Sequence, residues 1–208
     1  MSFGYTGQIL RLDLTTGDIS IDKPDEKFYR TCFGGRGLIA HLLLENIPAG
    51  ADALGPENIL VFAGSVLTGL PIPGSARVSA GAKSPLTGGY GEGEGGGDWG
   101  VKLKWAGFDA LVVTGQAPAP IYVTINEDGI EIKNAEGIWG LEIHETITTI
   151  REKINDRKAP VAAIGPGGEQ LIRYACIALG THNYIGRCGL GAVMGAKNLK
   201  AIAVNGKQ

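Results

Sequence analysis

The chain has 208 residues, of which 44% are hydrophobic and 19% are charged. This composition is typical of a packed globule and excludes a disordered chain. The net charge is −2, and no cluster of Lys or Arg alternates with aromatic residues, which excludes nucleic-acid binding. The 34 glycines are more than twice the ordinary share of roughly 7%, and they indicate tight turns or close approaches of the backbone.

The cysteines Cys32, Cys176 and Cys188 are far apart in the sequence. Their spacing fits neither a disulfide framework nor a four-ligand zinc or iron–sulfur site, so we expect reduced thiols. The first residues show no basic stretch followed by an apolar one, and no apolar run reaches the roughly 18 to 20 residues of a membrane helix. We therefore expect a cytoplasmic protein without an export signal.

In chain order, the first predicted element is a hairpin over residues 8–22. A helix follows with apolar residues between Leu38 and Ile47, a second hairpin is predicted over 120–135 with its turn at 126–129, and a second helix is predicted over 141–155. Short β-branched runs predict buried strands at 59–63, 77–80, 110–114, 161–164 and 201–204. Helices and strands mix without a strict βαβ alternation, so the predicted fold class is α+β with mixed sheets.

Two stretches of the chain are similar to each other. Residues 100–116 align with residues 191–207 at an offset of 91 positions, and an arginine-led strand at 173–176 matches the one at 77–80. These matches predict a single domain over 1–208 with an internal duplication, in halves of about 58–116 and 160–207 around a pseudo-twofold axis. The alternative is that two glycine-bounded units agree by composition alone.

The two glycine-rich segments, 88–100 and 186–195, are predicted to be loops that lead into short helices. Such loops offer unobstructed N–H groups to an anion, usually phosphate. The nucleotide-binding patterns with known glycine spacings are absent. A loop that merely turns tightly remains the alternative interpretation.

Several motifs together cover nearly the whole chain. They are GYTGQILRLDLTTGDI, FGGRGL, LGPENILVFAGSVLTG, PGSARVSAGAKSPLTGG, GVKLKWAGFDALVVTGQAPAPIYVTI and GLGAVMGAKNLKAIAVNG. In this order and spacing they resemble the N-terminal domain of the tungsten-containing aldehyde ferredoxin oxidoreductases.

The resemblance implies a platform for tungsten, or molybdenum, carried by two pterin dithiolenes, with Mg²⁺ bridging the pterin phosphates. In such enzymes aldehydes become carboxylates, and electrons pass through a [4Fe-4S] cluster to ferredoxin. The cofactor supplies this chemistry, while the protein supplies positioning and electrostatics. The resemblance assigns no catalytic residue and no metal ligand to this chain.

The motifs also imply which residues contact the cofactor. The implied contacts are Arg77, Glu94, Gly96, Asn183, Tyr184, Gly186 and Arg187. Two of them depart from the family pattern, because Glu94 stands where an amide is familiar and Asn183 where an arginine is familiar. Both changes make the segments less positive beside phosphates, which favours a bridging divalent cation.

Other conspicuous residues receive structural interpretations. Trp99 and Trp105 are predicted to be core anchors, Cys188 a small packed residue, and His182 a residue without a metal partner. For Arg36 a phosphate contact and a structural role at the helix start stay equally open.

Members of the family are longer, and their cluster cysteines lie in further domains. We therefore expect a fragment or one subunit, inactive alone, whose partner polypeptide supplies those domains; ferredoxin, a small aldehyde and a possible homodimer complete the expected partners. The alternative is a free-standing, non-catalytic module that binds pterin or another phosphate-bearing ligand in its glycine-rich cleft.

Overall fold

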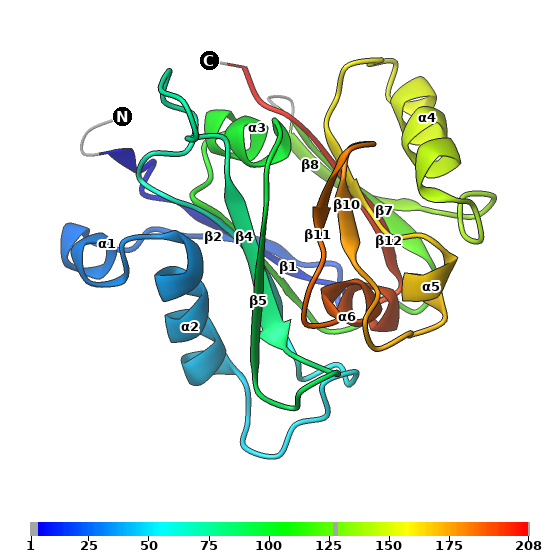
Figure 1. Ribbon diagram of the computed structural model, residues 1–208, viewed down its shortest axis with the longest axis horizontal. Helices are drawn as coiled ribbons and strands as arrows, with labels where there is room; N and C mark the ends of the chain where they lie inside the picture. The colour runs from blue at the N-terminus through cyan, green and yellow to red at the C-terminus, as the bar shows by residue number, and fades with distance from the viewer. Residues whose placement is uncertain (1–3, 127–128, 208) are drawn as a thin grey trace.

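The computed structural model describes residues 4–126 and 129–207. It contains two six-stranded sheets that face each other, with helices between them and on both outer sides (Figure 1). The first sheet consists of β1 (Ile9–Asp13), β2 (Ile19–Asp22), β3 (Leu60–Gly64), β4 (Val78–Lys83), β5 (Tyr90–Gly95) and β6 (Ala110–Thr114). The second consists of β7 (Ile121–Asn126), β8 (Gly129–Asn134), β9 (Val161–Ala163), β10 (Ile177–Leu179), β11 (Asn183–Ile185) and β12 (Leu199–Asn205). The helices are α1 (Glu26–Cys32), α2 (Gly35–Asn46), α3 (Trp99–Trp105), α4 (Ile143–Lys153), α5 (Pro166–Glu169) and α6 (Leu190–Ala196).

The two sheets have the same topology. Their strand orders are β2-β1-β6-β3-β4-β5 and β8-β7-β12-β9-β10-β11. In each sheet one pair is parallel, β1 with β6 and β7 with β12, and the other pairs are antiparallel. The α+β class with mixed sheets is thus confirmed. The duplication and its boundaries remain a prediction, and the shared topology would extend each half back to its opening hairpin.

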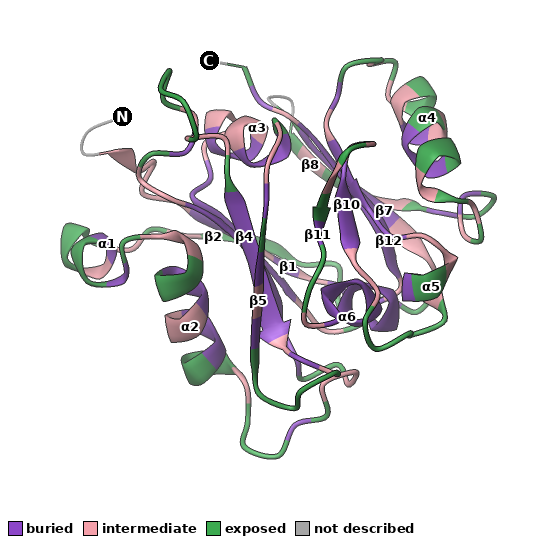
Figure 2. Cartoon of the chain, viewed as in Figure 1, coloured by how far each residue is buried: buried purple, intermediate pink, exposed green. Residues whose placement is uncertain are grey.

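The hydrophobic core has three parts, separated by the sheets. The central part joins the inner faces of both sheets with α3 and α6 and contains Phe62, Trp99 and Met194. A second part packs α1 and α2 on the outer face of the first sheet, and a third packs α4 on the outer face of the second. The central strands are therefore buried on both faces (Figure 2), which is why they read as continuous apolar runs.

The predicted hairpins, the two long helices and the strands β3, β4, β6, β9 and β12 are confirmed, although residues 127–128 of the second turn lie outside the described residues. Three predictions are wrong. Residues 186–195 are predicted to be a loop, but α6 already begins at Leu190. Residues 90–95, predicted to belong to a loop, form β5, because every second residue is a glycine and no apolar alternation marks the strand. Residues 173–176 precede β10, which begins at Ile177. Among the described residues, no helix combines the length and the apolar character needed to cross a bilayer.

Candidate functional site

The glycines of β5 face the second sheet. A Cβ atom on Gly91 would lie 2.9 Å from the Cβ atoms of both Cys188 and Ser84, and one on Gly93 would lie 2.9 Å from Cγ2 of Ile185. The edge strands β5 and β11 consequently lie side by side (Figure 1), with the side chains of Ile185 and Leu179 packed directly on the bare backbone of β5. Much of the glycine in 88–97 therefore allows the two sheets to approach closely.

The opposite face of β5 carries side chains that meet the first turn of α2. Arg36 donates from Nη2 to Oε1 of Glu94 over 2.9 Å, and the same nitrogen lies 3.9 Å from Oε2 of Glu92. The hydroxyl of Tyr90 donates to the backbone carbonyl of Arg36 over 3.0 Å. The hydrogen bond to Glu94, followed by the charges of Glu92 and Glu94, raises the pKa of the Arg36 guanidinium. This face therefore holds a cation between two carboxylates.

The ends of β5 and β11 meet at the glycines that follow β5. A Cβ atom on Gly96 would lie 3.3 Å from Oδ1 of Asn183, and one on Gly97 would lie 3.0 Å from its Nδ2. The carbonyl of Ala76 lies 3.9 Å from the same Gly96 position, which places the residue before Arg77 at this junction. The structure thus brings Arg77, Gly96 and Asn183 into one neighbourhood.

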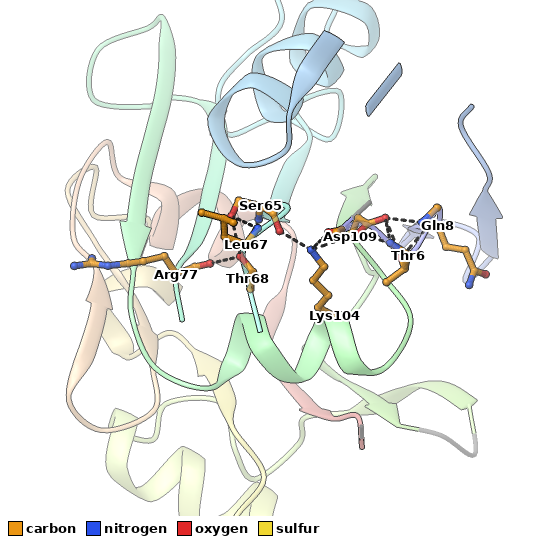
Figure 3. A network of polar contacts seen from close by, with 10 residues as sticks. Thr6, Gln8, Ser65, Leu67, Thr68, Arg77, Lys104 and Asp109 are labelled. Atoms are coloured by element: carbon orange, nitrogen blue, oxygen red, sulfur yellow. Dashed lines mark hydrogen bonds and ion pairs between the residues drawn. The ribbon is translucent and has the colours of Figure 1, made fainter. Parts of the chain in front are cut away.

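A network of polar contacts holds the backbone of Arg77 (Figure 3). The buried Thr68 hydroxyl donates to the Arg77 carbonyl over 2.9 Å and accepts from the backbone N–H of Ser65 over 2.8 Å. Lys104 donates to the Ser65 carbonyl over 2.5 Å and lies 3.9 Å from Asp109. Burial lowers the pKa of Lys104, and the charge of Asp109 opposes that shift. The side chain of Arg77 points away from this network and is exposed.

The remaining predicted contacts lie on and after β11. Tyr184 is 45% exposed, and its side chain alternates with that of buried Ile185. Gly186 has no heavy atom within 4 Å of a Cβ position, so its backbone is open, and Cγ of the exposed Arg187 would lie 3.0 Å from a Cβ on Gly93. Glu94 differs from this group, because its carboxylate accepts a hydrogen bond from Arg36.

The residues with structural interpretations lie mostly as expected. Trp99 is almost fully buried, its Nε1 donates to the Ile202 carbonyl over 2.9 Å, and its ring packs on Phe62. Cys188 packs against the glycine face of β5 with a left-handed φ of 65°. Over the described ranges, no group of three or more His, Cys, Asp or Glu side chains is placed to hold a metal ion.

A hollow of about 380 Å³ lies apart from the predicted contacts, between α2 and the turn before β5. Its lining is mostly apolar and includes Leu43, Leu44 and Tyr90, and none of the seven predicted contact residues belongs to it. Of the seven, Arg77, Gly96 and Asn183 lie together where β4 begins, β5 ends and β11 begins, whereas Gly186 and Arg187 follow the other end of β11, with Arg187 beside Gly93.

Comparison with known proteins identifies the family. Residues 9–206 match the family described as "Aldehyde ferredoxin oxidoreductase, N-terminal domain". The chain belongs to this family. It is 44% identical over 206 residues to the tungsten-containing aldehyde ferredoxin oxidoreductase of Pyrococcus furiosus, and 42% identical to that of Thermococcus kodakarensis. The match covers 99% of this chain and 34% of each relative. The predicted resemblance is confirmed, and the chain is an N-terminal domain of a family of tungsten oxidoreductases.

Two further comparisons show how varied the family is. An aliphatic sulfonate oxidoreductase, WOR-like subunit, of Pyrococcus furiosus is 33% identical over 220 aligned residues. The active site complex BamBC of benzoyl coenzyme A reductase, solved in complex with 1,5-dienoyl-CoA, superposes with a TM-score of 0.96 at 37% identity, over 100% of this chain and 32% of that chain. This chain spans about a third of the length of these relatives.

Sequence reasoning missed Glu92, Thr68 and Lys104. The run YGEGEG, residues 90–95, carries a period of two that could have revealed Glu92 on the face of Glu94. For Lys104 no local signal exists, because its carbonyl partners Gly4 and Ser65 lie 100 and 39 positions away. The partners of Thr68, Ser65 and Arg77, are 3 and 9 positions away, within a segment that has no regular period.

Proposed function

We propose that this chain is the cofactor-binding platform of a tungsten or molybdenum bis-pterin oxidoreductase. In this proposal aldehydes are oxidised to carboxylates, and electrons pass through a [4Fe-4S] cluster, bound outside this chain, to ferredoxin. The observation that carries it is the meeting of the β5 and β11 ends, where Gly96 and Gly97 lie against Asn183. Family membership supports the same role.

The residues at this junction fit a large anionic group. The guanidinium groups of Arg77 and Arg187 are exposed, and neither bonds to another described residue. A planar fork of donors suits phosphate. The open backbone at Gly186 leaves room for close approach, and Mg²⁺ between phosphates would offset the charge of Glu94.

The bound group would supply the redox chemistry, and this chain would supply binding and orientation. Arg77 and Arg187 would hold negatively charged edges, while the amide of Asn183 and the hydroxyl of Tyr184 would set orientation through hydrogen bonds. Thr68 would keep Arg77 in place through its carbonyl. The aldehyde, ferredoxin and a polypeptide equivalent to the remaining two thirds of the relatives are the proposed partners.

The test is co-expression of the chain with that polypeptide, followed by measurement of tungsten, molybdenum, pterin and iron per protein. We expect metal and pterin to be bound together in the assembly. The metal and pterin content per protein should fall about tenfold in Arg77→Ala and in Arg187→Ala, because each substitution removes a charge-assisted hydrogen bond. Arg157→Ala is the matched control, since Arg157 is exposed and outside the junction. An assembled complex without pterin would contradict the proposal, and pterin binding by the chain alone, without metal in the assembly, would favour a free-standing module.

A further inference from the structure

The ion pair between Arg36 and Glu94 joins residues 58 positions apart, from the first turn of α2 to the last part of β5. The side chains are 67% and 42% exposed, respectively. Exposed ion pairs contribute little to stability, roughly 0 to 1 kcal/mol. A contribution to folding stability is therefore a weak explanation for the ion pair of Arg36 and Glu94.

The surroundings of the pair suggest a charge-related reason. Glu94 is separated by one residue from the Gly96–Gly97 segment that meets Asn183. An uncompensated carboxylate there would repel any anion bound at the junction. Arg36 removes that repulsion by donating to the carboxylate, and the Tyr90 hydroxyl holds its backbone in place.

Arg36 also has a second carboxylate within reach. Oε2 of Glu92 lies 3.9 Å from its Nη2, and the Glu92 side chain is 10% exposed. Oε1 of Glu92 is buried and has no hydrogen-bond partner among the described residues. If Glu94 releases Arg36, the guanidinium therefore keeps an acceptor on the same strand.

We infer that Arg36 is a binding and charge-compensating residue for a phosphate-bearing ligand at the junction of β5 and β11. Its guanidinium neutralises Glu94 and presents further N–H donors to a phosphate oxygen. A guanidinium carries five donors, and one of them reaches Glu94. This inference deepens the proposed function and rests on it for the location of the ligand.

The experiment measures pyrophosphate binding to the full 208-residue chain by calorimetry at low ionic strength. We expect Arg36→Ala to weaken binding about tenfold, because a charge-assisted hydrogen bond is lost. Glu94→Gln should tighten binding several-fold, because it removes the competing carboxylate. Arg36→Lys should lie between wild type and Arg36→Ala, since it restores charge without the planar fork.

The matched control is the ion pair of Arg30 and Glu26 on α1, whose side chains are 68% and 48% exposed. Arg30→Ala and Glu26→Gln change the net charge by the same amounts as the two test variants, and they should leave the affinity within about twofold of wild type. Thermal unfolding of every variant confirms that it folds.

Three results would overturn the inference: equal losses in Arg36→Ala and Arg30→Ala, weaker binding in Glu94→Gln, or no pyrophosphate binding by the wild-type chain. Its failure is distinguishable from failure of the proposed function. A chain that shows the expected variant pattern but never acquires tungsten or pterin in the assembly keeps Arg36 as an anion contact and rejects the oxidoreductase platform. The opposite outcome keeps the platform and rejects Arg36.

Discussion

The two sheets carry buried charges of opposite sign at matching positions. Asp109 lies just before β6, and Lys200 lies 91 positions later, within β12. Asp109 is 3.9 Å from Lys104, and each of these two has other hydrogen-bond partners. Lys200 is bonded directly to Glu169 and also to the Leu141 carbonyl. The same topology thus tolerates either sign where an opposite charge is supplied.

The two arrangements differ in how far they extend. Through Lys104 the first continues to Ser65, Thr68 and the backbone of Arg77 (Figure 3). The second ends at α5 and at the segment before α4. Only the first therefore connects a buried charge to the candidate site, and its residues should affect ligand binding, whereas those of the second should affect folding alone.

The largest expected effect comes from breaking the ion pair of Lys200 and Glu169. Glu169→Gln leaves the fully buried Lys200 without its counter-charge, and it should lower the free energy of unfolding by about 3 to 5 kcal/mol in urea titrations. Asp109→Asn should cost less, because Lys104 keeps two carbonyl partners. The double variant Glu169→Gln with Lys200→Met should recover much of the loss. Equal losses of unfolding free energy in Glu169→Gln and Asp109→Asn would contradict this difference between the two buried charges.

The next effect concerns Lys197, which joins the C-terminal end of α6 to the first sheet. Its ammonium donates to the carbonyls of Asn58 and Gly115, and burial lowers its pKa to about 8, although the charge of Asp13 opposes this shift. Since the unfolded chain binds the proton more tightly, the folded state carries a penalty below pH 8 that is relieved as the pH rises toward 10.5.

Relative to Lys197→Met, the wild-type free energy of unfolding should therefore rise by about 3 kcal/mol in total across this window. Urea unfolding at pH 7.5, 9 and 10 measures the difference. A difference that stays flat with pH would show that burial does not depress the Lys197 pKa.

A smaller difference in unfolding free energy is expected between glycine variants at the two edge strands, β5 and β11. Gly91→Ala should lower the free energy of unfolding by about 1 to 3 kcal/mol, because the added methyl group meets two Cβ atoms fixed to backbone. Gly186→Ala, in the segment after β11, meets no heavy atom within 4 Å and should cost under about 0.5 kcal/mol. Similar thermal midpoints for the two variants would contradict the close approach of β5 to the second sheet.

The smallest effect tests whether the network that runs from Asp109 to the backbone of Arg77 influences ligand binding. Thr68→Val removes the hydrogen bonds to Ser65 and Arg77 and should cost about 1 to 2 kcal/mol, with pyrophosphate affinity reduced two- to threefold. Thr146→Val is the control from α4, where the buried hydroxyl donates to the Leu141 carbonyl over 3.3 Å. It should leave the affinity unchanged, and a change of equal size would remove the special role of Thr68.

The predictable parts of the fold are those with a local signal. The strands β3, β6 and β12 read as apolar runs because both faces are buried, and α4 shows its isoleucines at helical spacing. The strands β10 and β11 have three residues each, too few to show a period. Only pairing with a neighbour defines them.

The same limit applies to the candidate site. Sequence motifs indicated Arg77, Glu94 and Asn183, and the structure supplies their surroundings. The pairing of Arg36 with Glu94 depends on how α2 packs over β5, which no local pattern encodes. The sequence predicts an anion-binding loop at the glycines of β5, because a glycine-rich stretch indicates close approach of the backbone without identifying the neighbouring group.

The bare backbone of β5 on the side of the second sheet has a mechanical consequence. Buried side chains of the second sheet, Leu179 and Ile185, lie directly against the glycines of β5, so β5 has no side chain there that could change the distance between the two edges through a rotamer change. A ligand that spans both edges therefore meets a spacing set by this packing, and chains of this fold could adjust their preference through the groups presented along the rim.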